Sequence, residues 1–183
     1  MTLITETLPS AGIWKLDPSH TSVAFIARHL MVTKVRGTFK DVSGTIVIAD
    51  EPDASSVDVT IGVSSVDTGA SDRDAHLRSA DFFDAEKFPS MRFVSTGIER
   101  SSDDWRMSGD LTIKDVTRPV TLDVDFEGVV ADPWGTSHAA FTARTEIDRE
   151  DWGLTWNVAL EAGGLLVSKK VTIEIEAQLI PAA

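Results

Sequence analysis

The chain of 183 residues contains no cysteine and no tyrosine. The absence of cysteine excludes disulfides, thiol nucleophiles and thiolate metal sites. Basic residues are scarce, because 17 lysines and arginines stand against 29 acidic residues and give a net charge of −12. Nucleic-acid binders need clustered Lys and Arg to displace counterions, so we expect no nucleic-acid partner. The same deficit argues against docking on an anionic membrane surface.

Long apolar runs are also missing. No stretch approaches the roughly 18 residues that a membrane-spanning helix needs, so we expect no integral membrane association. The N-terminal sequence has neither a basic region nor an apolar region of the kind found in secretory signals. We therefore expect a cytoplasmic protein, with a flexible lead at residues 1–11 and a single domain over residues 12–183.

The chain is rich in alternating apolar and polar residues. In 120–127 every second residue, from Val120 to Phe126, is apolar, and those between are polar. This period is typical of a strand with one dry face and one wet face. About eight segments show it strictly or approximately, which predicts an all-β antiparallel barrel or sandwich rather than a parallel sheet. These segments are 21–32, 36–48, 57–63, 91–99, 105–113, 120–127, 137–147 and 171–179.

Two stretches differ from this pattern and predict one or two short helices. In 71–79, Ser71 precedes Asp74 by three residues, which resembles a capping box. The second stretch, 156–162, is followed by two glycines that would end a helix. Within the strand segment 36–48, Gly37 and Gly44 are expected to mark bends or bulges.

Local motifs give no support for catalysis. The four histidines form neither an HxH nor an HExxH pair, so no metal site is predicted, although distant strands could still assemble one. No serine lies in a GxSxG turn and no glycine-rich nucleotide loop is present. We therefore predict no catalytic residue, no metal and no cofactor.

Several polar residues invite two readings. His29 continues the face of Val23 and Phe25, so it could meet the head group of a ligand or bond a buried carbonyl. The segment 72–77, with Arg73 and His76, could hold a head group at a barrel mouth or form surface ion pairs of little energetic weight. The five tryptophans could line a cavity or plug the barrel ends.

A series of motifs runs in order through nearly the whole chain from residue 13. They are WKLDPSHTSVAF at 14–25, VRGTF at 35–39, RDAHL at 73–77, DFFD at 81–84, GDLTI at 109–113, VTRPV at 116–120 and REDWGL at 149–154. With this series the chain resembles the YceI family of lipid-binding proteins. It departs from the family at Asp115, where a glycine is common, and at 168–170, where a glycine-containing turn is common.

The resemblance implies a single lipocalin-like antiparallel eight-stranded β-barrel with a long tunnel for a polyisoprenoid or similar amphiphile. A prenyl pyrophosphate or a prenyl quinone would be such a ligand, and the protein would carry, store or sequester it. Family members are often homodimers, which we expect here as well. Many are periplasmic, so this chain would belong to a cytoplasmic branch.

An eight-stranded barrel is just wide enough to be filled by side chains or to hold one narrow ligand. In the second case we expect the apolar strand faces to line the tunnel, with His29, Arg36, Arg73 and His76 at its mouth, since an Arg fork matches a pyrophosphate. An enzyme acting on an isoprenoid lipid and a ligand-free structural or stress-response module are the alternatives. The expected lining residues are Val23, Phe25, Phe39, Ile61, Phe93, Trp105, Met107, Leu111, Ile113, Leu122, Phe126 and Phe141.

Overall fold

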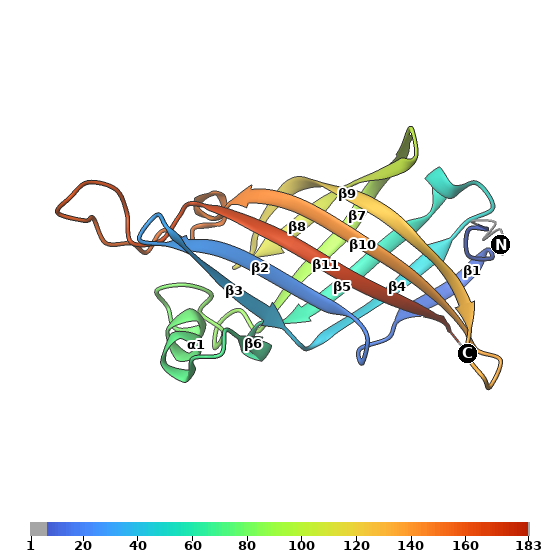
Figure 1. Cartoon of the computed structure of the whole chain (residues 1–183), viewed down its shortest axis with the longest axis horizontal. Coiled ribbons are helices and arrows are strands. Elements are labelled where there is room, and N and C mark those ends of the chain that lie inside the picture. The colour runs from blue at the N-terminus through green and yellow to red at the C-terminus, as the bar shows by residue number, and fades with distance from the viewer. Residues whose placement is uncertain (1–6, 183) are drawn as a thin grey trace.

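The computed structural model describes residues 7–182, which form a closed antiparallel β-barrel (Figure 1). Most of the segments with alternating sequence became its longest strands. The strands are β1 (Gly12–Leu16), β2 (Ser22–His29), β3 (Thr33–Phe39), β4 (Val42–Ile48), β5 (Ser56–Gly62), β6 (Val66–Asp67), β7 (Ser90–Ser101), β8 (Asp104–Ile113), β9 (Val116–Ala131), β10 (Ser137–Asp148) and β11 (Lys170–Pro181).

These 11 strands make an eight-stranded barrel, as predicted, because three barrel strands are broken in two. Both β1 and β2 pair with β11, β1 at residues 179–181 and β2 at residues 172–176. The second barrel strand consists of β3 and β4, which pair with β2 and β1. The third consists of β5 and β6, which pair with β4 and β3. When β1 and β2, β3 and β4, and β5 and β6 are each counted as one strand, the eight strands follow one another around the barrel in chain order. Strand β11 then closes the ring by pairing with β1 and β2.

The structure contains one α-helix, α1 (Ser71–Arg78), which confirms the first of the two expected helices. The expected capping box is wrong. The N-cap position is Ala70, and the Asp74 carboxylate accepts instead from the N–H and the hydroxyl of Thr68, at 2.8 and 2.6 Å. Since Asp74 is buried, this pair fixes the start of α1 to the end of β6.

The second expected helix, at 156–162, is also wrong. This stretch belongs to a long connection between β10 and β11 that begins with the 3₁₀ turn Arg149–Trp152. Its backbone folds back on itself through a bridge between Ala159 and Leu165, with a tight turn at Gly163. The two glycines therefore serve a hairpin-like turn rather than a helix end. Two further 3₁₀ turns lie at Pro52–Ala54 and Val63–Ser65.

Gly37 and Gly44 are not at bends, contrary to expectation. Both lie inside regularly paired strands, and the break in this segment falls between them at Lys40 and Asp41. A Cβ on Gly37 would collide with the ring of Phe25 on the neighbouring strand. The glycine therefore makes room for an aromatic ring, and its backbone stays extended.

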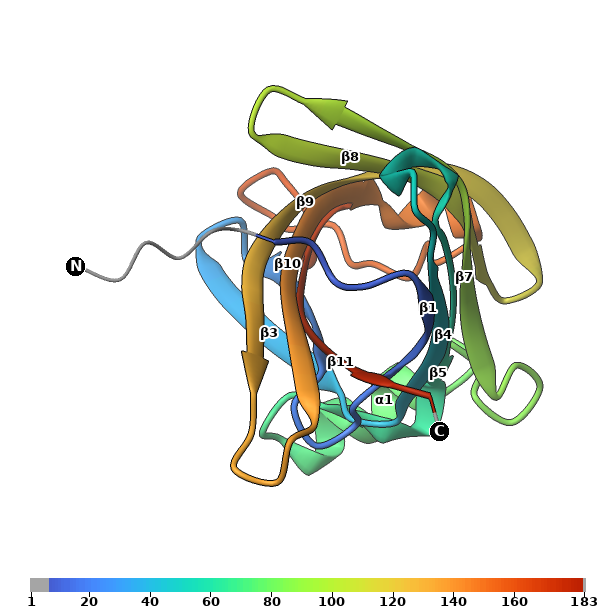
Figure 2. The ribbon, with the colours of Figure 1, turned by 90° about the vertical axis from the view of Figure 1, so that its right-hand side faces the viewer.

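The two ends of the barrel differ. The hairpins β4–β5 and β9–β10 and both described chain ends lie at one end, which we call the terminal end (Figure 1). Helix α1 and the connection 153–169 lie at the other, the helix end. Seen from the terminal end, the segment leading into β1 crosses the opening of the barrel (Figure 2). Among residues 7–182, no helix has the length and apolar character needed to cross a bilayer.

Candidate functional site

The barrel encloses a cavity of about 440 Å³ that extends along its interior. Its lining reaches from Leu8 and Pro52 at the terminal end to Leu77 and Arg149 at the helix end. A volume in this range is typical of sites that hold a small molecule or one lipid chain. The apolar strand faces therefore surround a hollow interior and do not meet in a solid core.

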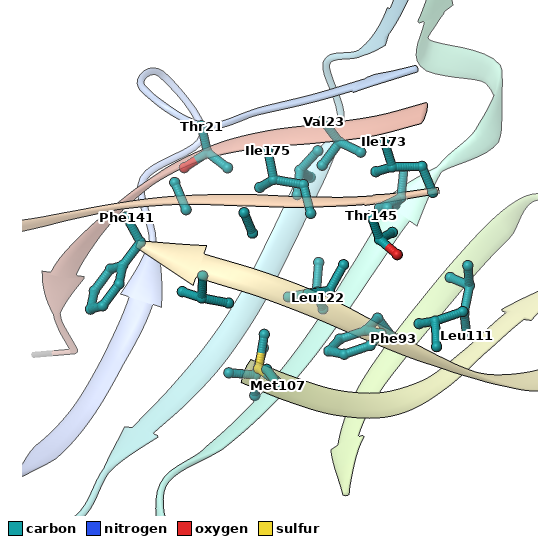
Figure 3. A pocket seen from close by; sticks show the side chains of 18 of the residues that line it. Thr21, Val23, Phe93, Met107, Leu111, Leu122, Phe141, Thr145, Ile173 and Ile175 are labelled. Atoms are coloured by element: carbon teal, nitrogen blue, oxygen red, sulfur yellow. The ribbon is translucent and has the colours of Figure 1, made fainter. Parts of the chain in front are cut away.

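The walls of the cavity come from strands on all sides. Side chains of Val23, Phe93, Met107, Leu122 and Ile175 point into the same space from β2, β7, β8, β9 and β11 (Figure 3). Of the residues that the sequence predicts for the wall, all but one line this space. Those that line it are Val23, Phe25, Phe39, Ile61, Phe93, Trp105, Met107, Leu111, Ile113, Leu122 and Phe141.

The exception is Phe126, which does not line the cavity. It lies on the same face of β9 as Leu122 and Val124, both of which do. Its ring packs against that of Phe141, with the centroids 5.1 Å apart. The register between β9 and β10 shifts at this point, between Ala140 and Phe141, where Glu127 is an extra residue in β9; Phe141 lines the cavity. Phe126 therefore lies beside the lining and contacts it through Phe141.

None of the four polar residues expected at the mouth lines the cavity, so the described lining gives no support to their contact with a head group. Arg36 projects from the outer face of β3 and pairs with Glu174 at 2.9 Å. His29 is exposed at the end of β2, two residues beyond Ala27, the last residue of that row in the lining. Arg36 is therefore directed away from the barrel interior, and His29 lies beyond the end of the lining.

Arg73 and His76 are occupied by contacts within the region of α1. The guanidinium of Arg73 donates to the hydroxyl and the carbonyl oxygen of Thr68, at 2.8 and 2.9 Å. The His76 ring lies 2.8 Å from Asp81 and stacks edge-on against Trp156. These contacts hold α1 and the connection 153–169 together over the helix end, which is a structural role.

The buried arginine of the cavity is Arg149, which the sequence analysis did not select. It is 4% exposed and lies in the lining at the helix end, beside Phe82, Leu154 and Val167. The strand pattern contained a signal for it, because Ala143, Thr145, Ile147 and Arg149 share one phase and all line the cavity. Extending the alternation of β10 past its last apolar residue would have placed Arg149 inside the barrel.

The Arg149 side chain is held by backbone carbonyls. Its Nε donates to Ser168 O at 2.9 Å, Nη1 to Leu154 O at 2.6 Å, and Nη2 lies 3.5 Å from Val167 O. The guanidinium also lies 5.9 Å from the centre of the Phe82 ring. Burial lowers the pKa of Arg149, and the carboxylates of Glu150 and Asp148 oppose that effect.

Apart from Arg149, the described lining has one ionisable residue, the exposed Asp50 at the terminal end. No histidine of residues 7–182 lines the cavity, and no group of three or more metal-binding side chains occurs among them. A hydrolase needs a nucleophile or activated water next to a base. Thr142 of the lining donates to Glu127 at 3.0 Å, but Glu127 is exposed and does not line the cavity. Within the described chain, no hydrogen bond joins a hydroxyl group of the lining to an ionisable side chain that also lines the cavity.

The terminal end of the cavity is covered by the segment before β1. Leu8, Pro9 and Ala11 belong to the lining, and Pro9 is buried. The indole Nε1 of Trp14 donates to Ser10 O at 3.0 Å and ties this segment to β1. The flexible lead was expected over residues 1–11. Residues 1–6 lie outside the described chain, while Leu8, Pro9 and Ala11 contribute to the site.

A closed antiparallel barrel around one apolar cavity defines this molecule as a hollow β-barrel of the lipocalin-like class. The chain belongs to the YceI family, since the model of the YceI-like domain matches residues 14–179. It is 42% identical over 147 residues to Protein YceI of Escherichia coli O17:K52:H18, covering 79% of this chain and 77% of that one. Protein YceI of Salmonella newport is 40% identical over 148 residues, covering 79% and 78%.

Solved structures agree with this fold. A Campylobacter jejuni YCEI protein matches with a TM-score of 0.72 and 31% identity, over 85% of this chain and 90% of that chain. BcnA of Burkholderia cenocepacia gives 0.76 and 22%, over 89% and 98%. A polyisoprenoid binding domain of Saccharophagus degradans gives 0.71 and 16%, over 94% and 100%. At such identities the last two comparisons support the fold alone.

Proposed function

We propose that this protein binds one long isoprenoid lipid of the prenyl pyrophosphate or prenyl quinone type inside the barrel. The observation that carries the proposal is the apolar cavity that extends through the barrel interior from Leu8 to Arg149. Burial of apolar carbon contributes about 0.8 kcal/mol per CH₂-sized group, so a chain of several isoprene units gains affinity without directional contacts. The Saccharophagus degradans domain of the same fold is a polyisoprenoid binding domain, which supports the same ligand class for this protein.

The role that fits this site is carriage, storage or sequestration. The ligand would be shielded from water over most of its length, which an insoluble lipid requires for transfer through an aqueous phase. Catalysis is a weaker proposal, because the lining contains no pair of nucleophile and base within residues 7–182. The cytoplasmic location and the homodimer remain predictions, and light scattering of the purified protein would measure the second.

Native mass spectrometry tests the lipid-binding proposal directly. Freshly purified protein should carry extra mass that disappears after extraction with organic solvent. The extract should contain a prenyl lipid, and the stripped protein should take up a prenyl alcohol added from detergent. The proposal would be overturned if the freshly purified protein has the mass of the polypeptide alone and the protein takes up no prenyl lipid. A straight-chain lipid in the extract, with no uptake of prenyl alcohol, would overturn the isoprenoid assignment alone.

A further inference from the structure

Arg149 places a positive charge at the helix end of a largely apolar tunnel. Its side chain is buried at the helix end of the cavity, with Phe82, Leu154 and Val167 as its apolar neighbours. No ion pair of Arg149 with a carboxylate occurs within the described chain. A buried cation without an anionic partner is costly, and proteins normally pair such a charge.

The two nearest acidic residues are engaged elsewhere. Asp148 accepts a hydrogen bond from the backbone N–H of Glu150 at 3.0 Å. The carboxylate of Glu150 pairs with Lys169 at 3.1 Å. Both acidic residues act on the pKa of Arg149 from a distance, but neither forms an ion pair with it.

The carbonyl contacts leave donor capacity on the guanidinium. Nε and Nη1 have acceptors at 2.9 and 2.6 Å, but Nη2 has only Val167 O, at the long distance of 3.5 Å. A guanidinium has more N–H donors than these three carbonyls accept. Carbonyl oxygens also satisfy donors without neutralising the charge. An oxyanion in the tunnel would supply both an acceptor and the missing charge.

We propose that Arg149 is the head-group residue of the tunnel and binds an oxyanion, the phosphate or pyrophosphate of a prenyl lipid. This inference rests on the proposed lipid-binding function and adds an orientation to it. The head group lies at the helix end beneath α1 and the connection 153–169, and the tail extends toward Leu8 and Pro52 at the terminal end. The polar recognition site is therefore inside the barrel, at the end away from the chain termini.

The test compares two ligands that share one tail. Geranylgeranyl pyrophosphate and geranylgeraniol are titrated into lipid-stripped protein by calorimetry. Wild-type protein should bind the pyrophosphate at least about tenfold more tightly, as charge-assisted hydrogen bonds of this kind imply. In R149Q the ratio should fall to about one, because the tail contacts remain, and R149K should keep an intermediate ratio because it retains charge but loses the fork. R36Q is the matched control, since Arg36 lies on the outer face, and it should keep the wild-type ratio.

Two further measurements keep the outcome decisive if R149Q fails to fold. The Nε–Hε resonance of Arg149 in the wild-type protein should shift with the pyrophosphate lipid and stay in place with the alcohol. Inorganic pyrophosphate alone should not compete with the lipid, because the tail supplies most of the affinity. Equal wild-type binding of both lipids, or equal competition by inorganic pyrophosphate, would overturn the head-group proposal and leave lipid binding intact. Binding of neither lipid would overturn the proposed function itself.

Discussion

The ring of Phe93 on β7 lies over the backbone of Gly109 on β8, in the space that any other residue would fill with a Cβ. Phe93 is also one of the walls of the tunnel. The glycine therefore decides where the aromatic ring lies and how wide the tunnel is at this point. Phe25 and Gly37 repeat the arrangement on β2 and β3.

Replacing Gly109 with alanine should destabilise the barrel. The added methyl group displaces the Phe93 ring, and overpacking of this kind costs about 1–3 kcal/mol. Chemical denaturation would measure the loss in the free energy of unfolding. G97A is the control, because a Cβ at Gly97 meets nothing within 4 Å, and it should change stability by less than about 0.5 kcal/mol. Combining G109A with F93L should recover part of the loss, whereas additive effects would show that the two positions do not interact.

The turn between β8 and β9 should accept a stabilising substitution. Lys114 and Asp115 both have left-handed backbone, with φ of 51° and 59°. This conformation costs an ordinary residue about 1 kcal/mol, whereas glycine adopts it freely. We expect D115G to raise the free energy of unfolding by about 0.5–1 kcal/mol. D115V should lower it, and a thermal shift of the same sign in both variants would contradict this explanation.

Filling the tunnel should abolish lipid binding without unfolding the barrel. Ala143 on β10 lines the cavity, so the indole of A143W would occupy the path of the lipid chain. We expect prenyl alcohol to bind at least about tenfold more weakly, since several buried carbons lose their place. E146W places the same side chain on the exposed outer face of β10. It should bind as the wild type does, and weakening by both variants would show that the effect does not arise in the tunnel.

Acid should weaken the hairpin between β9 and β10. The hydrogen bond from His138, together with the N–H groups of Thr136 and Trp134, holds the pKa of Asp132 below its ordinary value of 3.8. Unfolding therefore raises this pKa, and the stabilisation is complete above the unfolded value. It is lost as the pH falls through the lower folded value. The free energy of unfolding should fall from about pH 5 toward pH 2, and less steeply in D132N.

The matched control for this pH dependence is D53N in the exposed turn Pro52–Ala54. It should follow the wild-type curve. A D132N protein with an unchanged acid limb would mean that the hairpin contributes nothing to acid unfolding. Exchange of the backbone N–H of Thr136 gives a local readout, since this group donates to Asp132 at 2.9 Å.

The strands could be predicted from the sequence because alternation depends only on which side of the sheet is dry. The same alternation places Arg36 on the outer face of β3, since it lies between Val35 and Gly37, which face inward. It also pointed to Arg149, which continues the inward phase of β10. For these two arginines, the phase of the strand predicts the location of the side chain better than the residue type does. The positions of Arg73 and His76 depend on how α1 packs against distant segments, and no local pattern encodes that packing.

The closure of the ring sets an order on folding. The other barrel strands pair with the barrel strand before or after them in chain order, whereas the first strand also pairs with the last, Trp14 with Pro181 and Ile26 with Thr172. Such a pairing requires nearly the full loop of chain to be brought together. In a chain still emerging from the ribosome, β1 and β2 can pair with β4 and β3, but they lack their second partner until β11 has been made. Until that moment β1 and β2 have a free edge, and the tunnel has no wall on that side.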